Sequence, residues 1–310
     1  MMNPVVVRLS ICWLAVSFCC LSCADEPWVK VPSRELLERT PGLIHETFDS
    51  TLMKTTVGYS LVLPPNYANS DKRFPVVYWL HGGGGNECSS LFTAQAWREL
   101  YDDQQIGEVI LVYPNGFRSG YMDHHDGKVM VESMIIRELI PRIDERFRTV
   151  ASRSGRSVHG FSMGASGSLK FAIKYPDLFC AAVAYGGGAI DTENTKRKFV
   201  LDILERNFKS DPKLIRQNNT YRMLEDNHES VRNSDVQFML ICGEEDSWKD
   251  TALRFQAALQ EKNIACPLTL MPDVGHNLKG LTKAAGATAA AFQDGVFRKA
   301  LRSSESNLTQ

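Results

Sequence analysis

The sequence of 310 residues predicts an α/β fold, built on a mostly parallel central sheet with helices on both of its faces. Short apolar runs alternate along the chain with longer helix-like stretches, which is the rhythm of β-α-β units. Most of these runs are apolar almost throughout, as expected of parallel strands covered on both faces. With 44% hydrophobic and 23% charged residues, the composition excludes general disorder and a polytopic membrane protein.

The elements follow from these runs in chain order. Two early runs, 44–50 and 57–63, alternate apolar and polar residues and come before Pro64-Pro65, so they predict an antiparallel pair at the sheet edge. The runs expected as parallel strands are Phe74–Leu80, Glu108–Tyr113, Arg156–Phe161, Cys180–Tyr185, Val236–Cys242 and Pro267–Met271. Helices are expected at Val131–Phe147, Met163–Tyr175, Asp250–Lys262 and Leu281–Leu301.

Residues 1–24 have the pattern of a secretory signal. Arg8 is followed by an apolar stretch, and small residues at Ser22 and Ala24 precede an acidic pair, so cleavage is expected after Ala24. The uncharged run of about 16 residues is short for a membrane anchor, which needs roughly 20. Lipidation at Cys23 is the less favoured alternative, since the three residues before it fit a lipobox poorly. We therefore expect a secreted or periplasmic protein.

Residues 25–310 are expected to form one domain, because no repeat or Pro/Gly-rich linker divides them. A polar insertion at about 189–234 interrupts the strand rhythm and predicts only short helical segments. It could be a partial lid or a solvated excursion, and both interpretations stay open. The 35 basic and 36 acidic residues nearly balance, which gives no reason to expect nucleic acid or an anionic membrane as partner.

Four cysteines remain after the predicted cleavage: Cys88, Cys180, Cys242 and Cys266. None has C-x-x-C or Cys/His spacing, so no zinc site is expected. An oxidising compartment would permit disulfides, but Cys180 and Cys242 lie in apolar runs where a buried thiol is the simpler interpretation. The pattern His124-His125-Asp126 lacks a third ligand at helical spacing, so no metal is expected there either.

The motif Gly160–Gly164, with the letters G-F-S-M-G, predicts a nucleophile at Ser162. It follows a strand-like run and opens a helix-like one, which is the setting of a nucleophile elbow. The flanking glycines relieve the crowding around such a strained turn. A plain Gly/Ser-rich turn at a helix start is the structural alternative.

The run His81–Gly85 predicts an oxyanion hole, because glycines let backbone N–H groups approach a developing negative oxygen closely. We assign the two donors to the amides of Met163 and Gly83, with Gly84 as the alternative. A phosphate loop is not favoured, since the Lys-[ST] of a P-loop is missing.

A base and an acid should follow the nucleophile in chain order, at the ends of later strands. His276 follows the last strand-like run and is preferred as base to His228, which lies inside the polar insertion. Asp246 is preferred as acid, because Gly243 and two further residues give its loop room to turn toward His276. The rivals are Glu244, Glu245 and Asp250.

Taken together, these segments resemble the putative-esterase (esterase D-like) family of α/β-hydrolases. The resemblance covers roughly residues 44–300 and is carried by HGGGG at 81–85, ELIP at 138–141, GFSMGASGS at 160–168, YPDLF at 175–179, GEED at 243–246 and GHN at 275–277. It implies the α/β-hydrolase fold with about eight strands, the Ser162, Asp246 and His276 assignment, and no cofactor. The family includes feruloyl and acetyl xylan esterases and S-formylglutathione hydrolases.

The predicted function is a secreted serine carboxylic-ester hydrolase that works through an acyl-enzyme. Feruloyl or acetyl groups on plant or other polysaccharides are the expected class of ester. Two alternatives stay open: an acyltransferase using the same acyl-serine, and a noncatalytic carbohydrate-binding relative. The acyl group, the alcohol and the oligomeric state are left open.

Overall fold

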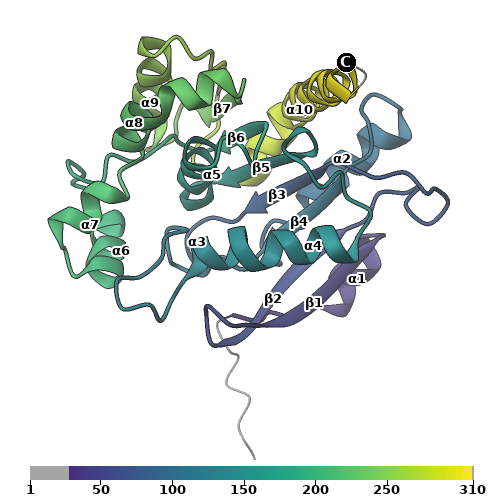
Figure 1. Ribbon diagram of the computed structural model, residues 1–310, viewed down its shortest axis with the longest axis horizontal. Helices are drawn as coiled ribbons and strands as arrows, with labels where there is room; N and C mark the ends of the chain where they lie inside the picture. The colour runs from purple at the N-terminus through teal and green to yellow at the C-terminus, as the bar shows by residue number, and fades with distance from the viewer. Residues whose placement is uncertain (1–27, 309–310) are drawn as a thin grey trace, which may run out of the picture.

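An eight-stranded sheet forms the centre of the computed structural model, which describes residues 28–308 (Figure 1). The predicted signal segment 1–24 lies outside the described residues. The strands are β1 (Leu43–Ser50), β2 (Thr55–Val62), β3 (Val76–Leu80), β4 (Ile110–Pro114), β5 (Arg156–Phe161), β6 (Ala181–Tyr185), β7 (Gln237–Gly243) and β8 (Leu268–Met271). Each predicted strand is present, with ends that differ by one or two residues.

The strand order is β1-β2-β4-β3-β5-β6-β7-β8. β2 pairs antiparallel with both β1 and β4, and from β4 to β8 all neighbours are parallel. The predicted antiparallel pair at the edge and the mostly parallel α/β-hydrolase sheet are thereby confirmed. Because parallel strands end at one edge of the sheet, the loops that follow β3, β5, β7 and β8 meet there.

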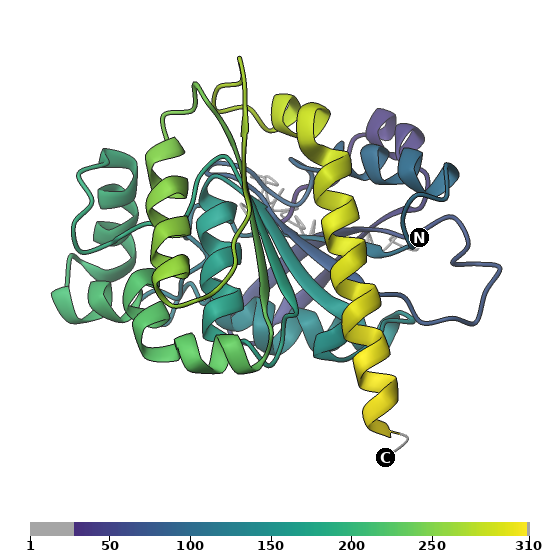
Figure 2. The same cartoon turned by 90° about the horizontal axis from the view of Figure 1, so that it is seen from above.

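Helices cover both faces of this sheet (Figure 2). One face carries α2 and α10, and the other carries α3, α5, α8 and α9, each with its own buried apolar cluster. The bounds are α1 (Arg34–Arg39), α2 (Thr93–Asp102), α3 (Val131–Met134), α4 (Ile140–Arg146), α5 (Met163–Lys174), α6 (Lys198–Phe208), α7 (Pro212–Gln217), α8 (Thr220–Asn233), α9 (Lys249–Glu261) and α10 (Leu278–Leu308).

The helix expected over 131–147 is present but changes its winding. A π-helical stretch, η1 (Ile135–Leu139), joins α3 to α4, and the Ile140 N–H donates to the Ile135 carbonyl. Pro141 follows directly and has no N–H to donate, which explains why the ordinary ladder is interrupted at this point. A short 3₁₀ turn, η2 (Arg153–Gly155), then leads into β5.

The segment 189–234 contains more helix than expected. The prediction of only short helical segments was wrong, since α6 and α8 have 11 and 14 residues. α8 buries Met223, Leu224 and Val231, and it packs against α5 in the layer that covers the sheet. A connection between the parallel neighbours β6 and β7 must cross over the sheet, and α8 does this. Because the exposed side of α8 is polar, the sequence did not indicate that this helix packs on the sheet.

A buried ion cluster joins α3 to α5 behind the nucleophile motif. The Glu132 carboxylate lies 2.6 Å from Lys170 Nζ and 2.5 Å from Lys174 Nζ, and it accepts a 2.6 Å hydrogen bond from the Tyr175 hydroxyl. Burial opposes the charge on Glu132, but the two lysines outweigh it and lower the pKa of its carboxyl to about 2. Lys170 Nζ also donates to the Tyr121 carbonyl at 2.5 Å, and burial lowers the pKa of its ammonium.

Replacing Glu132 with glutamine is expected to lower the free energy of unfolding by about 3 kcal/mol, because it leaves the Lys170 charge buried and unpaired. The carboxyl has a lower pKa folded than unfolded, so its contribution is full above about pH 4.5 and is lost as pH falls toward 2. Urea unfolding should therefore show a smaller gap between parent and Glu132→Gln at pH 3 than at pH 6. Glu145→Gln, on the exposed side of α4, is the control. A gap that did not change with pH would contradict the assignment.

Candidate active site

Ser162 lies on a sharp turn between β5 and α5. Its backbone has φ 56° and ψ −112°, a left-handed conformation that is strained for a serine. A Cβ on Gly160 would collide with the Gly164 carbonyl, and one on Gly164 would collide with the Leu80 carbonyl. The two glycines are therefore required by close backbone approach, as the motif predicts. The Ser162 N–H donates to the Tyr185 carbonyl at 2.9 Å, which ties the turn to β6.

The side chains of Ser162, His276 and Asp246 form one hydrogen-bonded line. His276 Nδ1 lies 3.0 and 2.9 Å from the two Asp246 carboxylate oxygens, and His276 Nε2 lies 2.8 Å from Ser162 Oγ. A carboxylate only accepts, so Nδ1 carries the proton and Nε2 accepts from the serine hydroxyl. The structure brings together all three residues that the motif and the chain order select.

Asp246 is buried and is held in its charged form. Burial opposes its ionisation, but hydrogen bonds from His276 and from the Trp248 N–H, at 2.8 Å, outweigh it and lower the pKa of the carboxyl. A charged Asp246 fixes the orientation of the imidazole and stabilises its protonated form. The His276 ring also stacks on Phe161, with ring centroids 4.8 Å apart.

The rival residues lie elsewhere. His228 is on α8, where its Nδ1 contacts the Glu225 carbonyl at 2.8 Å. Glu244 and Glu245 are exposed, and Asp250 is paired with two arginines at the start of α9. None of these rivals contacts His276 in the part of the chain described, which supports the choice of Asp246.

The glycine-rich loop follows β3 and lies beside the elbow. His81 is buried, its Nδ1 donates to the Gly82 carbonyl at 2.7 Å, and its Nε2 accepts from the Gly116 N–H at 2.9 Å. Burial lowers the pKa of His81 to about 4, so it stays neutral and locks the loop in place. This structural role was not predicted. Gly83 lies against the ring of Phe199, and the donor roles of Gly83 and Met163 stay predictions.

A pocket of about 630 Å³, including the part open to solvent, begins at Ser162. Ser162, Ser166 and Lys170 line it at four-residue spacing, so the lining follows about two turns of chain from the nucleophile into α5. α6 contributes three residues to the lining, and Trp248 from the loop after β7 also lines the pocket. The apolar lining residues are Met122, Met163, Ile190, Phe199, Val200, Ile203 and Trp248.

The cysteines of the described residues are free. Burial raises the pKa of the Cys180, Cys242 and Cys266 thiols to about 12, so they are inert core side chains. Residues 28–308 contain no cluster of three or more His, Cys, Asp or Glu side chains suited to a metal ion. In the pattern His124-His125-Asp126, where no metal is expected, His125 Nδ1 lies 2.9 Å from the Asn207 carbonyl.

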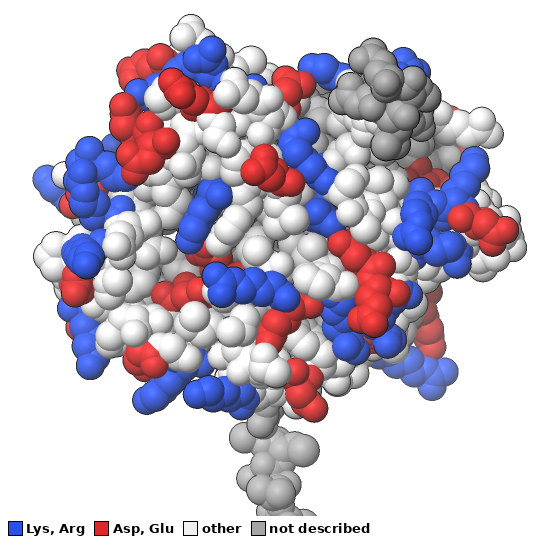
Figure 3. All heavy atoms as spheres, viewed as in Figure 1, with Lys and Arg blue, Asp and Glu red and all other residues white. Residues whose placement is uncertain are grey.

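The surface charge and the character of the helices bear on whether a charged polymer or a membrane could be a partner. On the face shown in Figure 3, acidic and basic side chains are interspersed rather than gathered by sign. Within the described part of the chain, none of the helices has both the length and the apolar character needed to cross a bilayer.

The family model described as Putative esterase matches residues 50–276, which includes the elbow, the acid loop and the histidine. The chain belongs to this family. The resemblance seen in the motifs is thereby confirmed.

Curated relatives match part of this chain. An esterase of Mycobacterium tuberculosis is 34% identical over 156 residues, covering 49% of this chain and 34% of the relative. An endo-1,4-beta-xylanase/feruloyl esterase of Xylanibacter ruminicola is 30% identical over 147 residues, covering 44% of this chain and 20% of the relative. The matches thus span about a third or less of the length of these relatives.

Solved structures share the fold over most of the chain. A ferulic acid esterase matches with a TM-score of 0.70 at 21% identity, covering 82% of this chain and 98% of that one. An S-formylglutathione hydrolase from Agrobacterium tumefaciens has a TM-score of 0.67 at 18% identity, covering 81% and 95%. A ferulic acid esterase from Anaeromyces mucronatus, determined with ferulic acid, has a TM-score of 0.60 at 19% identity, covering 89% and 95%.

Proposed function

We propose that this esterase is a serine hydrolase in which Ser162 is the nucleophile, His276 the general base and Asp246 its orienting acid. The observation that carries the proposal is the position of the His276 ring, whose two nitrogens contact the Ser162 hydroxyl and the Asp246 carboxylate. Adjacent nucleophile and base, with the base held by a third group, is the arrangement that activates a serine hydroxyl.

The cycle has two halves. Ser162 Oγ attacks the ester carbonyl carbon while His276 Nε2 takes its proton, and the N–H groups of Met163 and Gly83 stabilise the negative oxygen. The bond to the alcohol then breaks, His276 returns the proton to the leaving oxygen, and an acyl-serine remains. Water attacks the acyl-serine with the same proton transfers, which releases the acid and restores the Ser162 hydroxyl.

The pocket favours a bulky apolar acyl group over acetyl. Its length of about two helical turns along α5 exceeds an acetyl group several-fold and suits an aromatic acyl such as feruloyl. Burying such a ring between apolar side chains contributes favourably in proportion to the area removed from water. The feruloyl esterases among the relatives and solved structures support the same substrate class.

We further propose that the protein is exported and acts on ester groups attached to polysaccharides. The pattern of residues 1–24 supports export, and a relative that joins a xylanase to a feruloyl esterase supports a polysaccharide substrate.

The test compares methyl ferulate, methyl acetate and acetylated xylan as substrates of the mature protein. We expect release of the free acid from each ester that is hydrolysed. To correct for intrinsic reactivity, the kcat/KM of each ester is divided by its rate constant for hydrolysis by hydroxide. The corrected kcat/KM for methyl ferulate should be at least about tenfold above that for methyl acetate. A fluorophosphonate should label Ser162, as identified by peptide mass spectrometry. Absence of labelling together with no hydrolysis would overturn the proposed function. Preference for acetyl esters would overturn only the acyl assignment.

A further inference from the structure

Trp248 links the pocket to the acid of the site. Trp248 lines the pocket, and its backbone N–H donates to Asp246 Oδ1 at 2.8 Å. Its ring centroid lies 6.4 Å from that of His276. Trp248 is only half-buried and sits in the loop between β7 and α9, so its position depends on whatever packs on its outer face.

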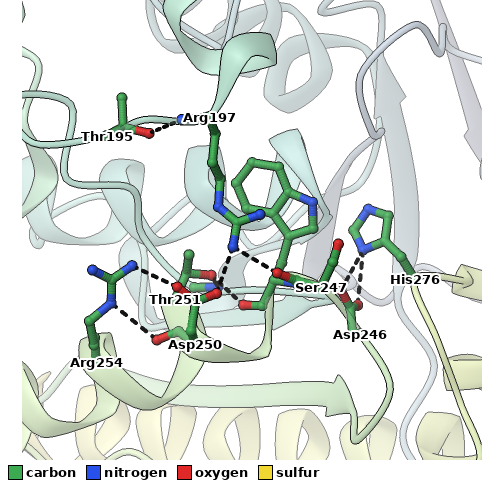
Figure 4. A network of polar contacts seen from close by, with 10 residues as sticks. Thr195, Arg197, Asp246, Ser247, Asp250, Thr251, Arg254 and His276 are labelled. Atoms are coloured by element: carbon green, nitrogen blue, oxygen red, sulfur yellow. Dashed lines mark hydrogen bonds and ion pairs between the residues drawn. The ribbon is translucent and has the colours of Figure 1, made fainter.

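Arg197 packs on the Trp248 ring, and Figure 4 shows its guanidinium pointing toward Ser247 and Asp250. Its guanidinium carbon lies 4.0 Å from the centroid of the Trp248 ring. Its Nη2 donates to the Ser247 carbonyl at 2.7 Å and to Asp250 Oδ1 at 2.7 Å. The Arg197 side chain thus contacts the Trp248 ring, the residue before it and a residue shortly after it.

Arg197 comes from the 189–234 segment, about 50 positions before the loop that it holds. It is the cap residue of α6, whose next turn carries Phe199 and Val200 into the wall of the same pocket. The contact therefore joins two walls that come from separate parts of the chain. Phe199 also lies over Gly83 of the glycine-rich loop, so the start of α6 spans the pocket from one side to the other.

We propose that Arg197 is a positioning residue that sets acyl selectivity by holding the Trp248 ring as a wall of the pocket. The inference rests on the proposed function and adds to it the residue that shapes the acyl subsite. A bulky acyl group needs that wall in place, whereas an acetyl group is too small to reach it. Loss of the contact should therefore weaken the binding of bulky esters without slowing the chemical steps.

The stack and the Ser247 carbonyl carry the effect, rather than the ion pair. The Asp250 side chain is 54% exposed and is shared with Arg254, 2.9 Å from its other oxygen. Exposed pairs of this kind contribute little. The planar guanidinium stacks on the indole and donates to the Ser247 carbonyl at the same time, a combination that the compact ammonium of lysine does not reproduce. Arg197→Lys should consequently behave like Arg197→Met, although it keeps the charge.

The experiment compares Arg197→Met and Arg197→Lys with Arg254→Met, which removes the other cation from Asp250 but touches neither Ser247 nor Trp248. We expect both Arg197 variants to raise KM for methyl ferulate by about fivefold, with kcat unchanged and the constants for methyl acetate within about twofold of the parent. Arg254→Met should match the parent. Equal losses on both esters, or the same shift in Arg254→Met, would overturn the proposal.

A double-mutant cycle tests whether Arg197 acts through Trp248. In a Trp248→Ala background, Arg197→Met should cause no further change in selectivity, and an additive change would overturn the proposal. Quenching of tryptophan fluorescence by ferulate gives the same comparison without turnover. A protein that bound ferulate through this contact but hydrolysed neither ester would contradict the proposed function and still support the role of Arg197.

Discussion

Replacing Ser162 with alanine is expected to lower kcat by on the order of 10⁴ or more, with the fold unchanged. The reason is that Ser162 Oγ is the single atom placed 2.8 Å from the base, so no bond to the acyl carbon forms without it. Removing one oxygen from a partly exposed turn leaves the buried clusters of both sheet faces intact. Turnover of methyl ferulate and the thermal unfolding midpoint should be measured on the same preparation.

The control is Ser152→Ala, at the amino end of β5 and thus at the opposite edge of the sheet. Its hydroxyl contacts Ser154 Oγ at 2.8 Å and has no part in the site. Activity of Ser162→Ala within tenfold of the parent would reject Ser162 as nucleophile. If the unfolding midpoint fell in Ser162→Ala but not in Ser152→Ala, the loss of activity would be due to misfolding.

Asp246→Asn is expected to reduce kcat by about 10⁴, as the wrong tautomer of the base becomes favoured. Asp246 Oδ1 accepts from the Trp248 N–H, and an asparagine would place its oxygen there. Its NH₂ group would then face His276 Nδ1 and require that nitrogen to accept. The ring proton would move to Nε2, pointing at Ser162, and the base would have no lone pair for the serine hydroxyl.

Glu245→Gln is the matched control, since it makes the same chemical change one position away on an exposed side chain. The measurement is kcat for methyl ferulate across pH, together with the rate of fluorophosphonate labelling, which also depends on the activated serine. If Asp246→Asn retained a tenth or more of the activity, or Glu245→Gln lost as much, the acid would have been wrongly assigned.

The parts of this fold that can be predicted from sequence are those in which local pattern and burial agree. β3 to β8 are buried on both faces or end in a functional loop. Their apolar runs can therefore be recognised from the local sequence, without knowledge of the neighbouring strands. The three site residues follow from the same logic, because each lies in the turn or loop that follows a parallel strand and such ends share one edge. The elbow adds backbone constraints that are local to Gly160 and Gly164.

The remaining parts depend on contacts between distant positions. α8 was underestimated because half of its residues are exposed and only a few reach the core. The buried role of His81 depends on Gly116, and the stack on Trp248 depends on Arg197. The residues next to His81 and Arg197 in the sequence do not indicate these partners. From sequence alone, His81 is an ordinary loop histidine and Arg197 is part of a short basic run.

The base, His276, follows β8, which is the shortest of the eight strands in the sheet. β8 has four residues, is only partly buried along its length, and pairs with β7 alone, whereas β5, which carries Ser162, is bonded on both sides. Short edge strands open at a lower free energy than central ones. Partial opening there would withdraw His276 while Ser162 and the central strands kept their places. We therefore expect activity to be lost at a lower urea concentration than the one that unfolds the central strands.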